Sequence, residues 1–290
     1  MTTFRPFAAD LWVAQSPLFA TNSGVWLTGF QAILIDPAIY PAEIAAMRDF
    51  LAARDVEPAT LILTHSHWDH VFGPAHFPGV PIVAHASFAR RAHAPDAHLL
   101  EKIARFEAEA DIHRDAPFVI PTPAQTFDDE GELRLGDRTL RLTHAPGHAA
   151  DQITVYDAAS GTLWAADMLS DLEIPFVSDS LAAYERTLAG LAARDIHALV
   201  PGHGAPTTDQ AEIQARLADD RTYLAELRER VARAVAAGQT LGEAVAACAD
   251  MRFRRPDDNA GPHRLNVESV YAELGGDTAG EAVGWAAAWD

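Results

Sequence analysis

The sequence predicts a mixed α/β protein with a helical C-terminal extension. Over about the first two hundred residues, short apolar runs alternate with segments of helical periodicity, which is typical of strands alternating with helices. After Thr208 the apolar residues keep helical spacing only. We therefore expect one domain over residues 1–208 and an α-helical extension over residues 209–290.

The first half of the chain should contain a hairpin, helices and buried strands. The apolar segment 26–35 predicts a strand or hairpin that ends at Asp36-Pro37. Pro41 suits the first position of a helix, because its fixed φ angle is already helical. That helix carries Ile44, Met47 and Leu51 at helical spacing. Strands are also expected at 60–63 and 81–84, and helical structure at 87–110 with a break near Pro95.

The second half begins with two hairpins and continues into helices. Gly136-Asp137 and Ser160-Gly161 are turn residues, and each pair lies between two short apolar runs. A helix at 181–193 and a strand at 198–200 should follow. The C-terminal helices are predicted by an apolar stripe from Ile213 to Val235 that stops at Gly238, a capping box at Thr240 and Glu243, and a last helix at 263–274.

Composition excludes several classes of partner. The 290 residues include 22 basic and 41 acidic side chains, a net charge of −19, which repels nucleic acid and anionic lipid. No run approaches the roughly 18 apolar residues of a membrane span. One cysteine, Cys248, allows no intrachain disulfide, and the first residues show no secretory signal pattern. We expect a cytoplasmic protein with a small-molecule substrate and no nucleic-acid or membrane partner.

Three histidines and an aspartate follow the strand expected at 60–63. They lie in the segment Thr64-His65-Ser66-His67-Trp68-Asp69-His70. If the backbone is extended there, His65 and His67 converge on one cation, and Asp69 and His70 turn toward a second position. Every buried polar group needs a partner, and a metal ion satisfies all four side chains at once. The segment therefore predicts a metal site.

Three later residues have the character of ligands at strand ends. His148 lies in Ala145-Pro146-Gly147-His148, Asp167 follows the strand that runs through Trp164, and His203 lies in Pro201-Gly202-His203-Gly204. Each signal is weak alone, but their combination with the histidine cluster is strong. A nitrogen and oxygen donor set without thiolate suits zinc, and it equally suits iron or manganese.

These motifs resemble those of the metallo-β-lactamase superfamily, whose hallmark is H-x-H-x-D-H followed by a later His, Asp and His. The resemblance covers roughly residues 23–206 and implies a four-layer αββα sandwich with the metal ions at one edge, between two β-sheets. It implies that one ion is bound by His65, His67 and His148, that the other is bound by Asp69, His70 and His203, and that Asp167 bridges the two. It also suggests that Asp36 and Asp151 accept N–H groups from metal-bound imidazoles, whereas His144 is expected to be structural.

The resemblance implies a dinuclear hydrolase. Two divalent ions lower the pKa of a bridging water toward neutrality and so supply a hydroxide nucleophile. Asp69 would orient that hydroxide or carry its proton to the leaving group, which makes it the expected catalytic residue. The expected substrate is an ester, a thioester, a lactone or a related small molecule.

The branch of the family stays open. The chain is similar to glyoxalase II and to quorum-quenching lactonases in its metal set, but we find no glutathione-binding motif. Residues 168–170 offer no tyrosine for a substrate carbonyl, and Tyr184 is a poor substitute. The basic cluster Arg252, Arg254 and Arg255 is expected to be a solvated face.

Two alternatives lie outside hydrolysis. A persulfide dioxygenase-like oxidoreductase would use a single iron and O₂, and a non-catalytic binding protein would keep a structural metal. The C-terminal helices could cover one side of the site, lend substrate contacts or form the interface of a homodimer.

Overall fold

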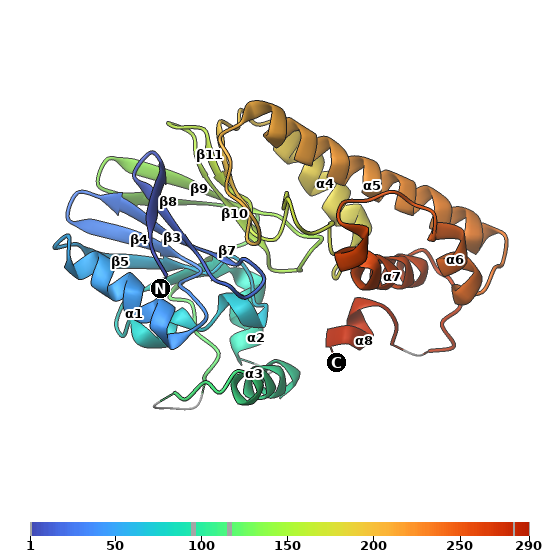
Figure 1. Ribbon diagram of the computed structural model, residues 1–290, viewed down its shortest axis with the longest axis horizontal. Coiled ribbons are helices and arrows are strands. Elements are labelled where there is room, and N and C mark those ends of the chain that lie inside the picture. Colours follow the sequence, from blue (N-terminus) through green and yellow to red (C-terminus); the bar gives the residue numbers. More distant parts are fainter. Residues whose placement is uncertain (1, 94–96, 115–117, 281, 290) are drawn as a thin grey trace. The chain divides into compact units, whose positions relative to one another are not determined.

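The computed structural model describes residues 2–93, 97–114, 118–280 and 282–289 (Figure 1). It forms two compact units, each described by itself here. The first unit comprises residues 1–144, 151–166 and 196–208, and the second comprises residues 145–150, 167–195 and 209–290. The second unit thus contains two short segments in addition to the predicted C-terminal extension.

The first unit is built on two β-sheets. The larger has the order β1-β2-β3-β4-β5-β6-β7, antiparallel from β1 to β4 and parallel from β4 to β7. Its strands are β1 (Arg5–Ala8), β2 (Leu11–Gln15), β3 (Asn22–Thr28), β4 (Gln31–Ile35), β5 (Glu57–Ile62), β6 (Ile82–His85) and β7 (Gln125–Phe127). The smaller has the order β12-β11-β10-β9-β8 and is antiparallel except for the β11–β12 pair. Its strands are β8 (Glu130–Leu135), β9 (Arg138–His144), β10 (Ile153–Asp157), β11 (Thr162–Trp164) and β12 (Ala198–Val200).

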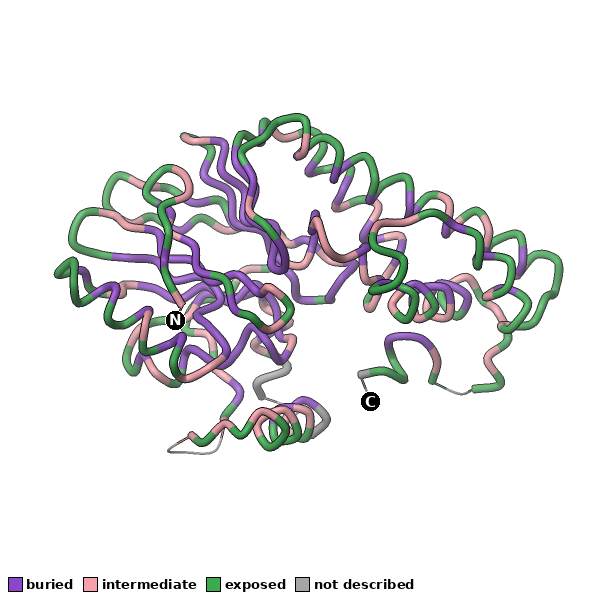
Figure 2. The backbone as a smooth tube through the Cα atoms, in the orientation of Figure 1, coloured by how far each residue is buried: buried purple, intermediate pink, exposed green. Residues whose placement is uncertain are grey.

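The two sheets share one apolar core. Trp26, Ile33 and Ile35 of the larger sheet form a single cluster with Leu142, Val155 and Trp164 of the smaller one. Strands β10, β11 and β12 are buried along their whole length, as Figure 2 shows. Because both sheets contribute to one core, they pack face to face as the two middle layers of a sandwich.

Helix α1 (Pro41–Ala52) covers the other face of the larger sheet. Its residues Ile44, Met47 and Leu51 join a second apolar cluster with Val25 and Leu34. The unit also contains the short 3₁₀ helices η1 (Trp68–His70) and η2 (Gly73–His76) and the helices α2 (Ala86–His93) and α3 (Ala97–Glu109). The break expected near Pro95 lies outside the described residues.

The second unit is helical. It contains α4 (Leu181–Ala192), α5 (Gln210–Ala236), α6 (Leu241–Cys248), α7 (Pro256–Glu273) and α8 (Trp285–Trp289). Helix α5 buries Ile213, Leu217 and Leu224 as its apolar stripe predicts, and Thr240 and Glu243 form the expected capping box. Within the described ranges, no helix is long and apolar enough to cross a membrane.

Helix α7 differs from the prediction. It begins at Pro256, not at residue 263, and continues through Pro262. Pro256 occupies the first helical position, where a missing N–H costs nothing. Pro262 removes a backbone hydrogen bond inside the helix, which nevertheless continues through it, so the expected start at residue 263 was wrong.

Candidate metal centre

The expected ligands of the first unit follow the C-terminal ends of strands. His65 and His67 lie just after β5, and His203 lies just after β12. The loop of His203 is fixed by Asn22, whose side-chain amide donates to the carbonyls of Pro201 and Gly204, at 2.8 Å each. The rigid strands fix the backbone of these side chains, and the loops that follow the strands leave the functional groups accessible to a ligand.

Asp69, His70 and His203 form one compact donor group. One ligand atom from each lies within 4.8 Å of the others. The Asp69 Oδ2 atom is 3.3 Å from Nε2 of His203 and 3.7 Å from Nε2 of His70. All three side chains are buried, so both imidazole Nε2 atoms face one carboxylate in a site shielded from bulk water.

Asp36 orients His70 from behind. Its Oδ2 atom lies 3.1 Å from Nδ1 of His70, and the carboxylate also accepts the N–H and the hydroxyl of Thr64 at 2.8 and 2.6 Å. This contact places Asp36 beside His70 Nδ1, where the resemblance implies an acceptor for a metal-bound imidazole. A carboxylate on Nδ1 fixes the tautomer and turns Nε2 toward a metal position.

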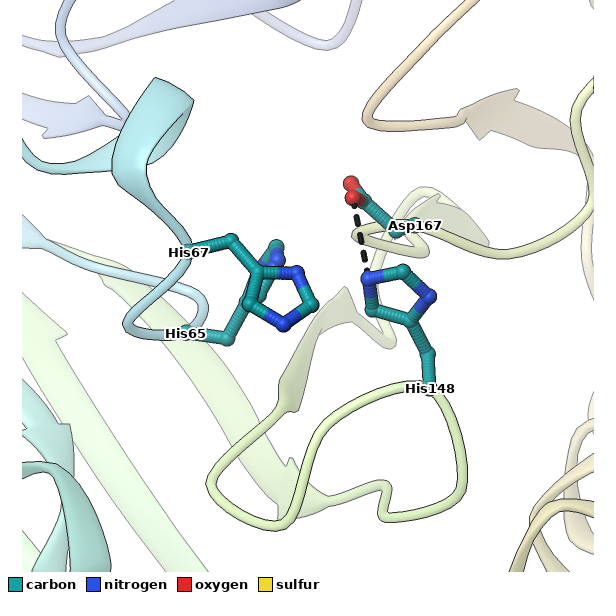
Figure 3. Close-up of side chains that lie close together, drawn as sticks. All are labelled: His65, His67, His148 and Asp167. Carbon is teal, nitrogen blue, oxygen red and sulfur yellow. Dashed lines mark ion pairs between the residues drawn. The ribbon is translucent and has the colours of Figure 1, made fainter. Parts of the chain in front are cut away.

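His65 and His67 form a second set of donors in the same unit. Their ring centroids are 4.6 Å apart, and Figure 3 shows the two rings beside each other. The ring of His65 also lies 4.3 Å from that of His70. Nδ1 of His65 is 3.1 Å from the Thr64 hydroxyl, so Thr64 links this histidine to Asp36. The two histidine rings thus lie on the same side of the segment that follows β5, as expected for alternate residues of an extended backbone.

The second unit contributes His148 and Asp167. His148 Nε2 lies 3.2 Å from Asp167 Oδ2, the contact drawn as a dashed line in Figure 3. Gly147 precedes His148 with φ +129°, and a Cβ atom there would lie 2.4 Å from the Cα atom of Tyr184. Only glycine combines that dihedral angle with such a close approach.

Strained backbone surrounds these ligands. Asp36, Ala166 and Leu169 have φ angles of +42°, +51° and +60°, in the left-handed region that non-glycine residues rarely adopt. Asp36 lies behind His70, and the other two flank Asp167. Such strain costs about 1–3 kcal/mol per residue and concentrates at functional sites.

Tyr184 supports the Asp167 segment through the backbone. Its hydroxyl donates to the carbonyl of Asp167 at 3.2 Å, and the side chain is fully buried. Burial, followed by the charges of Asp220 and Asp167, raises the pKa of Tyr184 well above its ordinary value. The hydroxyl is thus committed to the main chain, in keeping with the expectation that it is a poor substitute for a substrate-binding tyrosine.

Aromatic side chains flank the donor group of the first unit. Trp68 packs 4.5 Å from Phe106 of α3 and 6.2 Å from Phe19, which is 55% exposed and lies 6.4 Å from the ring of His203. Lys102 of α3, the one lysine in the sequence, is half-buried. Burial lowers the pKa of Lys102 to about 8, against the raising effect of Asp69. Neither Lys102 nor Phe19 was predicted to lie near the site, although Lys102 is visible in the sequence as a unique lysine.

His144 has a structural environment, as expected. Its ring stacks on that of His85 at a centroid distance of 3.8 Å. The pKa of His85 lies below its ordinary value, mainly because of burial and then because of the charge of His144. The hydrogen bond to the Asp128 carbonyl and the charge of Asp151 oppose this shift. Asp151 is itself buried near this pair.

Arg254 corrects the expectation for the basic cluster. Arg252 and Arg255 are exposed, but the Arg254 side chain is only 15% exposed and forms an ion pair with the buried Asp220. It also donates to the carbonyls of Ser170 and Glu173. The prediction of a solvated face was wrong for this residue, because its partners lie 34 to 84 positions away in the sequence.

The donor chemistry fits a divalent metal. Imidazole nitrogens and carboxylate oxygens converge in buried positions, and Asp36 orients one of the imidazoles. Zinc, iron and manganese all accept such donors. These side chains form a candidate metal site in an α/β sandwich.

The family follows from the sequence. The family model of the metallo-beta-lactamase superfamily matches residues 17–203, more than half of the chain. The chain therefore belongs to the metallo-β-lactamase superfamily and has its αββα fold, with a helical C-terminal extension.

Some of the relatives are named as thioesterases. The chain is 25% identical over 232 residues to an acyl-coenzyme A thioesterase, MBLAC2, from Gallus gallus, which covers 69% of this chain and 79% of that protein. It is 29% identical over 189 residues to the atrochrysone carboxyl ACP thioesterase AgnL7 from Paecilomyces divaricatus, which covers 65% of this chain and 51% of that protein.

Solved structures share the fold. The sec-alkylsulfatase Pisa1 from Pseudomonas sp. superposes with a TM-score of 0.76 over 97% of this chain at 17% identity, and this chain spans about half of that protein (51%). The metallo-β-lactamase family protein TTHA1429 from Thermus thermophilus superposes with a TM-score of 0.66 at 22% identity, covering 92% of this chain and 94% of that one.

Proposed function

We propose that this protein is a dinuclear metal-dependent hydrolase of small-molecule acyl compounds, with thioesters as its first substrate class. The observation that carries the proposal is the buried group Asp69, His70 and His203, with Asp36 behind His70. Catalytic metal sites combine such donors with hydrogen-bonded outer partners. The two named thioesterase relatives support the choice of thioesters.

The proposed ligand assignment follows the family's motif. His65, His67 and His148 would hold one ion, Asp69, His70 and His203 would hold the other, and Asp167 would bind both. Zinc is the first expectation, with manganese or iron as alternatives for the same donors. A cytoplasmic location and a homodimer remain predictions.

The chain's own residues would supply positioning and proton transfer. When bound, the two metal ions would activate a water molecule and polarise the substrate carbonyl. Asp69 would orient that water and carry its proton to the leaving group, because one of its oxygens lies at the centre of the donor group. Trp68 and the exposed Phe19 would offer apolar surface to an acyl group.

Metal analysis combined with a substrate panel tests the proposal. The purified protein, prepared without added metal, is analysed for zinc, manganese and iron and assayed with a small ester, a thioester and a lactone. We expect about two ions per chain and turnover of the thioester. A single iron without hydrolysis would overturn the proposal in favour of oxygen-dependent sulfur chemistry, and metal without any turnover would favour a binding protein.

Asp167→Ala provides the matching variant. We expect a folded protein that has lost one metal ion and nearly all turnover, because Asp167 is the proposed shared ligand. Asp49→Asn is the control, since it removes an exposed carboxylate of α1 that is outside the proposed ligand set. Full activity in Asp167→Ala would contradict the assignment.

A further inference from the structure

The segment that follows Asp167 is held by side chains of the C-terminal helices. Residues 168–180 form no helix or strand, and they belong to the same compact unit as α5 and α7. Such a segment has few backbone hydrogen bonds of its own, so its conformation depends on outside partners. These partners are arginine and asparagine side chains that bind its main-chain atoms.

Two arginines bind the first half of the segment. Arg216 of α5 donates to the Leu169 carbonyl at 3.1 Å. Arg254 donates to the carbonyls of Ser170 and Glu173, the latter at 3.2 Å. Asp220 completes this contact, because its carboxylate pairs with Arg254 and accepts the backbone N–H of Leu169. Charge-assisted hydrogen bonds of this kind are the stronger ones, and here they are buried.

Two asparagines of α7 bind the second half. Asn259 accepts the N–H of Ile174 at 3.4 Å and donates to the Leu172 carbonyl at 2.9 Å. Asn266 accepts the N–H of Val177 at 2.8 Å and donates to the Pro175 carbonyl at 2.7 Å. Both asparagines are buried, and each satisfies a donor and an acceptor of the segment at once.

The far end of the segment reaches the loop of His148. The Ser178 hydroxyl donates to the His148 carbonyl, and the N–H groups of Asp179 and Ser180 point to the Gly147 carbonyl at 3.1 and 3.3 Å. Phe176 lies 6.3 Å from the His148 ring. One continuous segment therefore starts at Asp167 and ends against His148.

We infer that Arg254, Asn259 and Asn266 are positioning residues, which hold the 168–180 segment so that Asp167 and His148 keep their 3.2 Å approach as a ligand pair. This inference rests on the proposed function only in taking that pair to bind metal. It gives the helical extension a role in metal affinity, distinct from covering the site, contacting substrate or forming a dimer.

Zinc binding to the full-length protein tests this inference. Zn²⁺ is titrated into metal-free wild type, Arg254→Met and Asn266→Ala, with Asp167→Ala as the reference for loss of the pair. We expect each positioning variant to weaken at least tenfold the zinc site that uses both His148 and Asp167, and to weaken the other site, which uses only Asp167, by less. Mutation of residues that orient metal ligands typically lowers metal affinity 10- to 100-fold, so the expected effect lies in the measurable range. Arg254→Lys, which keeps a cationic donor, should restore part of the affinity.

Arg255→Met is the matched control, because Arg255 is the exposed neighbour of Arg254 and pairs only with Asp258 among the contacts described. It should bind zinc as wild type does. The double variant Arg254→Met/Asp167→Ala should bind zinc no more weakly than Asp167→Ala, because both changes act through the same Asp167–His148 pair.

Three results would overturn the inference. Unchanged zinc affinity in both positioning variants would show that the segment holds its conformation without them. Equal weakening of both zinc sites would reveal a general loss of folding, and additive losses in the double variant would show that Arg254 does not act through Asp167. Wild-type protein that binds no zinc, manganese or iron would instead refute the proposed function itself.

Discussion

At the scale of single residues, Asp36 concentrates three interactions on one buried carboxylate. It contacts His70 Nδ1 and accepts both donors of Thr64. Asp36→Asn keeps a side chain that tolerates its φ of +42° but removes the charge that favours the His70 N–H. We expect metal affinity to fall about 10- to 100-fold, measured by competition with a chelator.

Asp55→Asn is the matched control for this change. Asp55 also has a positive φ, +53°, but it is exposed and precedes β5, whereas the histidines follow that strand. Metal affinity should stay at the wild-type value there. Equal affinity in Asp36→Asn would contradict the orienting role of Asp36.

Gly147 should be intolerant of a side chain. Alanine there must adopt φ +129° and place its Cβ 2.4 Å from the Tyr184 backbone. Relief of that clash would move the His148 loop, so we expect Gly147→Ala to unfold at lower temperature and to bind less zinc, with a stability loss of about 2 kcal/mol or more. Thermal unfolding with and without Zn²⁺ measures both effects.

Gly190→Ala supplies the contrast. Gly190 lies in α4, and a Cβ there meets no atom within 4 Å. Alanine in an exposed helix stabilises by about 0.5–1 kcal/mol relative to glycine, so this variant should match or exceed the wild type in stability. If Gly190→Ala were destabilised while Gly147→Ala kept wild-type stability, the proposed clash between residue 147 and Tyr184 would be contradicted.

At the scale of elements, α6 depends on its N-terminal cap. The Thr240 hydroxyl accepts the Glu243 N–H, and the Glu243 carboxylate accepts the Thr240 N–H at 2.7 Å. Thr240→Ala should reduce the free energy of unfolding by about 1 kcal/mol, whereas Thr240→Ser should be close to neutral because it keeps the hydroxyl. Urea denaturation of the two variants checks this, and an equal loss in both would contradict the capping role.

Elements with strong local signals were predictable. The hairpin turns at Gly136 and Gly161, the Pro41 helix start and the Thr240 capping box are local features, and the structure confirms the elements they predicted. The start of α7 was wrong, because Pro262 normally ends a helix and only the surrounding unit sustains the helix through it. The strands β1, β2 and β7 were not predicted; β7 has only three residues, too few to show a period.

The candidate site was predictable only in part. The candidate ligands could be picked out in the sequence because histidine and aspartate recur in a recognisable order, and their roles as ligands stay predictions. Arg254 and Asn266 were missed, because they bind main-chain atoms 80 or more positions away, which no local pattern reports. One signal was available: Asn259, His263 and Asn266 lie at helical spacing and are all buried, and a buried polar stripe on a helix implies partners.

At the scale of the whole molecule, Asp220 should make stability depend on pH. Burial raises its pKa from 3.8 to about 7, against the lowering effect of Arg254, while Asp219 adds a smaller raising effect. Between pH 3.8 and about pH 7, the Asp220 carboxyl is therefore protonated more often in the folded protein than in the unfolded chain. The contribution of Asp220 to the free energy of unfolding therefore falls as pH rises from about 4 to about 7.

Asp220→Asn removes this titration. The free energy of unfolding of the variant, relative to wild type, should therefore rise between pH 5 and pH 8, as measured by urea denaturation at both values. Asp219→Asn is the control, because Asp219 is the exposed neighbouring carboxylate. A parallel pH dependence in Asp220→Asn and wild type would contradict the raised pKa.

The path of the chain between the two units has a practical consequence. The chain enters the second unit three times, at Ala145, Asp167 and Asp209, and the first two entries carry His148 and Asp167. Cutting after Thr208 would therefore not release a minimal catalytic fragment, because residues 145–150 and 167–195 would lose the helices with which they fold.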